Sequence, residues 1–135
     1  MIEIYLISIV VGFLLGYLTN WLAIVSLFHP RKKFLGFQGL VPRYKKEIGE
    51  RIGENAHVIF PDSIKKVFQI PLIGDKIKDF FKDSVANEIV KMSDDELEKI
   101  IKKVAGRELR FIEVLGGVIG MVVGLLQAIL ISIVL

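Results

Sequence analysis

A long uncharged run near the N-terminus indicates the fold class of this protein. It reads IYLISIVVGFLLGYLTNWLAIVSLF, and it runs from Ile4 to Phe28 without a charged residue. As an α-helix, this stretch would be about 37 Å long at a rise of roughly 1.5 Å per residue. That length exceeds the roughly 30 Å hydrocarbon core of a bilayer, so we predict a tilted transmembrane helix over residues 4–28. A cleaved signal peptide fits less well, because Met1-Ile2-Glu3 has no basic residue and the apolar run is too long.

The C-terminal end has the same composition. Residues 111–135 read FIEVLGGVIGMVVGLLQAILISIVL, in which Glu113 is the only charged residue. This run predicts a second transmembrane helix over 111–135. The two predicted helices would form an antiparallel hairpin in an all-α membrane protein.

The charged residues lie almost entirely between the two apolar runs. All 18 Lys and Arg and 13 of the 15 Asp and Glu fall within residues 29–110, which we treat as an insert with a net charge of +5. Because basic residues flank only the inner ends of both runs, the insert is predicted to be cytoplasmic and both termini outside the cell membrane. Contacts with lipid headgroups are expected at the basic residues beside the spans, namely Arg31, Lys32, Lys33, Arg107 and Arg110.

Small or short polar residues recur at every fourth position of both runs. They are Ser8, Gly12, Gly16 and Asn20 in the first run, and Gly116, Gly120, Gly124 and Ala128 in the second. Residues four apart share one helix face, and lipid offers no hydrophobic drive between helices, so these faces predict close helix packing. Glycine is also common in membrane helices generally, which is the alternative interpretation. If residues are counted inward from Phe28 and from Phe111, those at equal depth in the membrane should lie together, which places Asn20 near Gly120 and Gly16 near Gly124.

Three polar side chains fall inside the predicted spans: Asn20, Glu113 and Gln127. An unsatisfied amide in hydrocarbon costs several kcal/mol, so Asn20 and Gln127 are expected to face protein. Glu113 is expected to pair with Arg110 near the interface. A role in ion transport is the alternative, since intramembrane carboxylates often mark conduction pathways.

The insert shows helical periodicity and no convincing strand. We predict helices at about 43–60, 63–69, 76–91 and 94–105, the last opened by a Ser93–Glu96 capping box and ended or bent at Gly106. Asp62 and Asp75 are possible caps for the second and third helices. Gly49 and Gly53 would allow a close helix crossing. The apolar segment 34–41 follows a basic cluster and predicts a loop that dips into the membrane surface.

The chain lacks the residue combinations that carry common chemistry. It has no cysteine, and its two histidines, His29 and His57, have no partner at metal-ligand spacing. We therefore expect no enzyme activity, no catalytic residues, no cofactor and no metal. The insert's positive charge is too diffuse to indicate nucleic-acid binding. The expected partners are membrane lipids and further copies of the chain, and the sequence identifies no other protein partner.

Motifs at both ends resemble one family. Gly16-Tyr-Leu-Thr-Asn20, Leu27-Phe-His-Pro30 and Gly39-Leu-Val-Pro-Arg43 occur in order, followed by Ser93-Asp-Asp-Glu-Leu97, Gly106-Arg-Glu-Leu-Arg110, Gly116-Gly117-x-x-Gly120 and Leu125-Leu-Gln-Ala128. In these motifs the chain resembles the YheB-like uncharacterised membrane proteins of the domain-of-unknown-function family 445. The resemblance implies membrane residence and the hairpin layout, in a compact version that lacks most of the long helical region of many members. It brings no catalytic residues.

Two functions remain in competition at this point. The first is a self-associating membrane scaffold or anchor that presents the helical insert toward the cytoplasm or the lipid surface. The second is an oligomeric transport or channel component that moves ions or lipids. We favour the scaffold, because the second span offers only Gln127 and Ser132 beyond Glu113 for a polar path.

Overall fold

The computed structural model describes residues 2–134, although not the side chains of His57 and Ile59. Within this range the chain is all-helical, as predicted, and two of its helices are long and apolar enough to cross a membrane. The chain divides into two compact units, which are described separately below. Unit 1 comprises residues 1–27 and 100–135, and unit 2 comprises residues 28–99.

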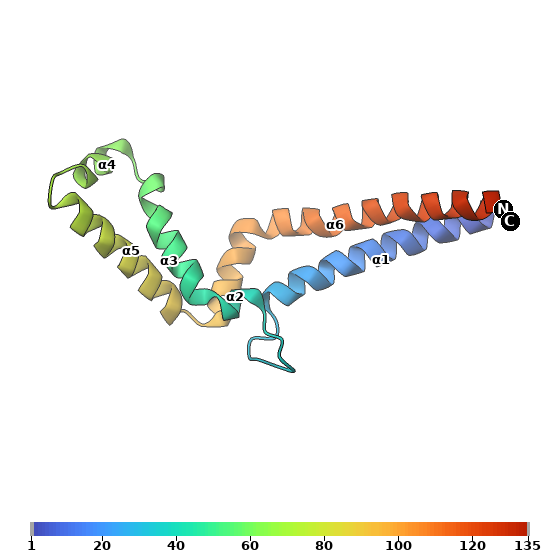
Figure 1. Ribbon diagram of the computed structural model, residues 1–135, viewed down its shortest axis with the longest axis horizontal. Coiled ribbons are helices and arrows are strands. Elements are labelled where there is room, and N and C mark those ends of the chain that lie inside the picture. The colour runs from blue at the N-terminus through green and yellow to red at the C-terminus, as the bar shows by residue number, and fades with distance from the viewer. Residues whose placement is uncertain (1, 135) are drawn as a thin grey trace. The chain divides into compact units, whose positions relative to one another are not determined.

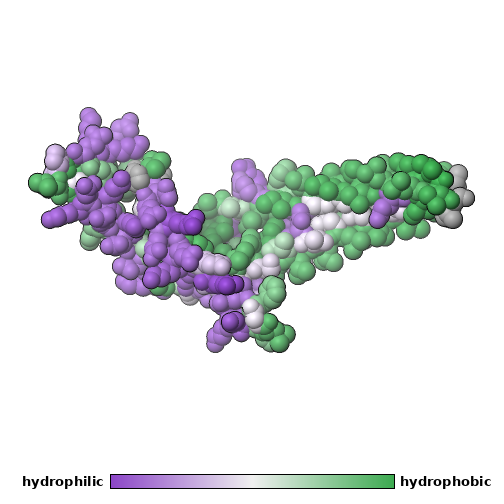
Figure 2. Space-filling view, viewed as in Figure 1, coloured by the Kyte–Doolittle hydropathy of each residue, from purple (hydrophilic) through white to green (hydrophobic). Residues whose placement is uncertain are grey.

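Unit 1 is built from α1 (Ile2–Phe28) and from the part of α6 (Asp94–Val134) that follows residue 99. The two helices run side by side in opposite directions, so that the start of α1 and the end of α6 lie at the same end of the pair (Figure 1). Large apolar side chains are exposed along both helices, and they cover most of the face of the pair that Figure 2 shows, in green. Leu14 and Leu18, for example, are 58% and 55% exposed. An apolar exterior of this kind is suited to hydrocarbon and costly in water.

α6 corrects one prediction. We expected a helix that ends or bends near Gly106 and a separate span from residue 111, and the structure has one α-helix that does not end between them. A lone glycine costs only about 1 kcal/mol in a helix interior and ends a helix mainly where it adopts positive φ. Gly106 does not have positive φ, and no proline follows it, so the backbone hydrogen bonds continue.

Unit 2 contains α2 (Leu40–Arg43), α3 (Lys45–Asn55), the short 3₁₀ helix η1 (Ala56–Ile59), α4 (Asp62–Phe68), α5 (Gly74–Lys91) and the first turn of α6. The single helix predicted over 43–60 is thus divided. Its last turn tightens to 3₁₀ because Phe60, which precedes Pro61, is extended and cannot continue an α-helix. Neither Asp62 nor Asp75 caps its helix, since both lie inside the first turn after Pro61 and Ile73 at the caps.

α3 and α5 pack closely in unit 2. A Cβ added to Gly49 would lie 3.2 Å from the Cα of Ala86, and one added to Gly53 would lie 3.0 Å from the Cα of Lys82. These contacts confirm the predicted close crossing at the two glycines. Phe60, Phe68 and Phe81 form an aromatic cluster beside it, with ring centroids 5.3 to 6.2 Å apart.

The predicted capping box is confirmed at the start of α6. The Ser93 Oγ accepts a hydrogen bond of 3.1 Å from the backbone N–H of Glu96, and the Glu96 carboxylate accepts one of 2.9 Å from the backbone N–H of Ser93. Two otherwise unpaired backbone donors are thereby satisfied.

Candidate functional site

The two helices of unit 1 meet along their glycine-bearing faces, in a contact that we call the seam. A Cβ on Gly12 would overlap the carbonyl of Gly120, and one on Gly16 would overlap the carbonyl of Gly116. Gly124 is equally close to the backbone of Ser8. Backbone therefore lies directly against backbone along the seam, and only glycine leaves room for this.

The pairing along the seam differs from the sequence-based expectation by about one helical turn. Gly16 lies against Gly116 and Gly120 rather than Gly124, and Asn20 lies beside Gly116 rather than Gly120. Counting inward from Phe28 and Phe111 assumed that both spans start at one depth. α6 has no boundary at Phe111, so the register is set by packing between the two helices instead.

Three polar contacts cross the seam. Asn20 Nδ2 donates a hydrogen bond of 2.8 Å to the carbonyl of Ile112, and the hydroxyls of Tyr5 and Ser132 lie 2.8 Å apart. Tyr17 Oη donates to Glu113 Oε2 at 3.4 Å. Among the described residues, Glu113 forms no ion pair with Arg110, so the expected pairing is replaced by this contact between the helices.

The tyrosines were missed by the sequence reasoning, although a signal for Tyr17 existed. Tyr17 stacks on Phe13, with ring centroids 6.2 Å apart, and Phe13 occupies the space that a side chain at position 117 would fill. The doublet Gly116-Gly117 thus leaves room both for the backbone of α1 and for an aromatic ring. A glycine doublet opposite two aromatics four residues apart indicates such a contact once the register is known.

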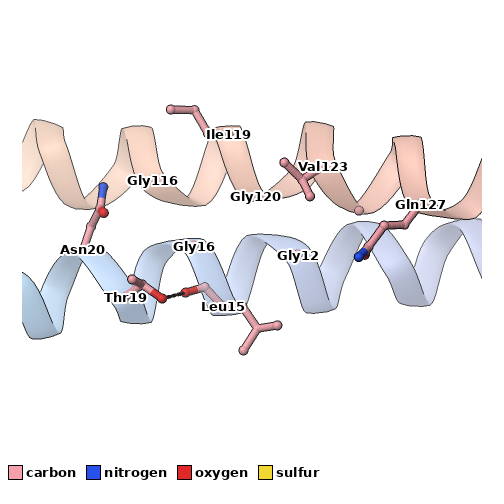
Figure 3. Close-up of a pocket in the computed structure, with 11 residues that line it drawn as sticks. Gly12, Leu15, Gly16, Thr19, Asn20, Gly116, Ile119, Gly120, Val123 and Gln127 are labelled. Carbon is pink, nitrogen blue, oxygen red and sulfur yellow. Dashed lines mark hydrogen bonds between the residues drawn. The ribbon is translucent and has the colours of Figure 1, made fainter.

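A shallow groove of about 370 Å³ follows one side of the seam. Figure 3 shows Asn20 reaching from α1 toward α6 and Gln127 reaching from α6 toward α1. Thr19, also in the groove, donates to the carbonyl of Leu15 in its own helix. The exposed Gln127 side chain has no hydrogen-bond partner among residues 2–134. Gln127 is therefore a polar group in an apolar groove that lacks a partner within the chain.

A second groove of about 610 Å³ lies between the same helices. Tyr17 and Trp21 contribute aromatic surface, Glu113 contributes a carboxylate, and three cations complete the polar lining, namely Lys102, Arg107 and Arg110. Trp and Tyr beside basic residues are typical of the membrane–water interface.

The other expected headgroup residues lie in unit 2 and differ among themselves. Arg31 Nη2 lies 3.1 Å from Asp95 Oδ1 and 3.3 Å from Glu98 Oε2. The hydrogen bond to Glu98 in particular raises the pKa of Arg31, while the hydrogen bond from Lys99 lowers the pKa of Asp95. Lys32 and Lys33 are exposed and have no ion-pair partner among the described residues. Arg31 thus fastens its segment to α6, whereas the two lysines are open to the surroundings.

No cluster of three or more acidic or histidine side chains that could hold a metal occurs within the described residues. The candidate interaction sites are the seam, its two grooves, and the exposed lysines Lys32 and Lys33.

Comparison with known proteins supports a membrane protein. The chain is 30% identical over 107 residues to the UPF0754 membrane protein SERP1382 of Staphylococcus epidermidis, covering 73% of this chain and 27% of the relative. It is 32% identical over 78 residues to the UPF0754 membrane protein GK0639 of Geobacillus kaustophilus, covering 50% and 21%. It is 35% identical over 74 residues to a UPF0754 membrane protein of Exiguobacterium sibiricum, covering 48% and 20%. The chain thus spans about a quarter of the length of these relatives, and no solved structure matches it.

Two apolar helices and relatives that are bacterial membrane proteins place the chain among membrane proteins of unknown function. Residues 69–134 match the model of the family described as "Protein of unknown function (DUF445)", which confirms the family predicted from the motifs.

Proposed function

We propose that the protein is a membrane-anchored scaffold. In this proposal α1 and the apolar part of α6 form an antiparallel transmembrane hairpin in the cell membrane, which holds the insert of residues 29–110 on the cytoplasmic side. Support comes from the backbone contact at the glycines and from the basic residues, which flank only the insert side of the spans. The proposal assigns no reaction and no cofactor to the chain.

We further propose that the hairpins self-associate through the seam groove. The seam glycines already contact each other within one chain, so they are not free to serve as the contact between copies. Gln127 is the observation that carries the proposal, because its amide lies in an apolar groove without a partner in the described chain. In hydrocarbon an unpaired amide favours association with any surface that offers a hydrogen bond, and a second copy offers Gln127 itself.

The test measures self-association in lipid. Wild-type chains labelled at one site and reconstituted at low density should show two-step photobleaching, and Gln127→Leu should weaken association about 3- to 30-fold, the equivalent of one interhelical hydrogen bond. Ser26→Ala is the matched control, since Ser26 donates only to Ala23 in its own helix and should change nothing. A wild type that stays monomeric at all densities, or a Gln127→Leu variant that associates normally, contradicts self-association.

Transport is the second candidate, and one observation favours it. Glu113 lines a groove of about 610 Å³ together with Tyr17 and three cations, which is a polar surface beside apolar helices. Reconstituted vesicles should then show ion or lipid movement that Glu113→Gln reduces. Vesicles without such movement in either form contradict this candidate and leave the scaffold standing.

A further inference from the structure

The segment between α1 and α2 folds into a small closed loop. The backbone N–H of Gly39 donates to the carbonyl of Pro30 at 2.8 Å, which closes the base of the loop two residues after the end of α1. At its tip, Phe34 and Phe37 exchange two backbone hydrogen bonds of 2.8 Å each. Gln38 Nε2 also donates to the carbonyl of Arg31 at 2.8 Å. The loop is therefore a built hairpin rather than an irregular linker.

The tip has an unfavourable residue at its turn. Leu35 and Gly36 form the turn with φ of 49° and 82°, the left-handed conformation that a type I′ turn requires at both central positions. Glycine adopts it readily, but a leucine there costs roughly 1–2 kcal/mol, and Asn or Gly is usual in its place. The two backbone hydrogen bonds between Phe34 and Phe37 hold Leu35 in this conformation.

The same tip carries three large apolar side chains that the chain does not cover. Phe34 is 66% exposed, Leu35 is 89% exposed and Phe37 is 76% exposed. In Figure 2, viewed as in Figure 1, the loop between α1 and α2 ends in an apolar cluster next to hydrophilic atoms. The exposed Lys32 and Lys33 lie immediately before the tip in the sequence.

We propose that the Phe34–Phe37 tip inserts into the interfacial layer of the bilayer that holds α1. Three properties of the loop indicate that the tip contacts the bilayer. Its base is tied to Pro30, so at no more than roughly 3.5 Å per residue the tip cannot lie far from the end of α1. Its apolar side chains match the boundary between headgroups and acyl chains, and its lysines match anionic headgroups. The inference rests on α1 lying in a bilayer and does not depend on self-association.

The tip would act as a second anchor for unit 2. Arg31 at one end of the loop is paired with Asp95 and Glu98 of α6, so insertion of the tip would hold the start of α6 as well. Of the three basic residues before the tip, Arg31 then has a structural role and Lys32 and Lys33 bind lipid headgroups.

Leu72 provides a matched control within unit 2. It also has positive φ, 68°, and is 87% exposed, in the turn between α4 and α5. Its turn, Ile70-Pro-Leu-Ile-Gly74, follows the nearest lysine pair, Lys65-Lys66, by four residues and is separated from α1 by more than forty residues. The two leucines thus have similar backbone strain and exposure, and they differ in how short the chain is that connects each of them to α1.

The experiment places single tryptophans in the full chain, reconstituted in bilayers of phosphatidylcholine and phosphatidylglycerol with brominated acyl chains. With Trp21→Phe as background, Leu35→Trp and Phe37→Trp should show blue-shifted emission, loss of fluorescence to lipid bromine and protection from aqueous iodide. Leu72→Trp should emit as in water and be quenched by iodide. Phe37 avoids the strained position, so its variant keeps the test valid if Leu35→Trp folds poorly.

The outcomes separate the tip from the membrane hairpin. Iodide quenching of Leu35→Trp and Phe37→Trp equal to that of Leu72→Trp overturns insertion of the tip. Equal bromine quenching at all three positions also overturns it, because the whole unit would then lie on the lipid. The unmodified chain reports on α1 through Trp21, and absence of bromine quenching there overturns the hairpin and the tip together.

Discussion

At the scale of single residues, the close contact between α1 and α6 depends on glycine, because any side chain at these positions would overlap the other helix. Gly12 and Gly16 on α1 face Gly116 and Gly120 on α6 so closely that an added Cβ would overlap a backbone carbonyl. Gly106, on the same long helix, has no such neighbour within 4 Å. A glycine therefore lies at the seam when it belongs to a series with four-residue spacing, and an isolated glycine such as Gly106 does not.

Replacement of Gly16 by alanine should destabilise the helix pair. The new methyl group must push the backbones apart, which costs about 1–3 kcal/mol for an overpacked contact. Gly106→Ala is the control, and it should be neutral or stabilising by up to about 1 kcal/mol because only helix propensity changes. Reversible unfolding in mixed micelles with increasing dodecyl sulfate measures both, and equal midpoints for the two variants would contradict the close seam.

At the scale of elements, α6 is more continuous than its sequence indicated. One helix carries the capping box at Ser93, the charged turns before residue 111 and the apolar span after it. Its N-terminal turn also holds the ion pairs with Arg31. The ion pairs at the start of α6 therefore help to fix the position of the segment that follows α1.

Loss of the cap should loosen the start of α6. Ser93→Ala removes the acceptor for the backbone N–H of Glu96, and an N-cap serine is typically worth about 0.5–2 kcal/mol. Hydrogen exchange of the amides at 94–97 should speed up, with little change beyond the first two turns. Ser84→Ala, at an exposed position inside α5, is the control and should leave those amides unchanged.

At the scale of the whole molecule, the proposed topology follows from charge. All basic residues lie between the two apolar segments, so the insert should lie in the cytoplasm and the N-terminal end of α1 should face the outside of the cell. Two independent features would then hold unit 2 at the membrane: its covalent connection to both spans and the apolar tip at 34–37.

The chain contains no cysteine, which makes this topology directly measurable. Lys78→Cys in α5 should react with a membrane-impermeant maleimide only after the cells are broken, because the reagent cannot reach the cytoplasm. Glu3→Cys should react in intact cells. The reverse labelling would place the insert outside and would remove the proposed role of Lys32 and Lys33 at the inner leaflet.

Several features could be read from the sequence because they depend on local composition. Uncharged runs long enough to cross a bilayer, helical periodicity in the insert and the Ser93–Glu96 cap all arise within one segment. The family was likewise recognisable from short motifs in order. In each case the signal and the structure that it predicts occupy the same few residues.

Tertiary packing alone decided the register of the seam, the contact between Tyr17 and Glu113, and the continuity of α6 past Gly106. Glycines spaced four apart fit each other equally well after a shift of one turn, so their spacing leaves the register open. Larger side chains select the register: Phe13 has space beside Gly117, and Asn20 reaches the carbonyl of Ile112, in the observed one. Contacts between residues some ninety positions apart depend on that choice, and no local pattern contains it.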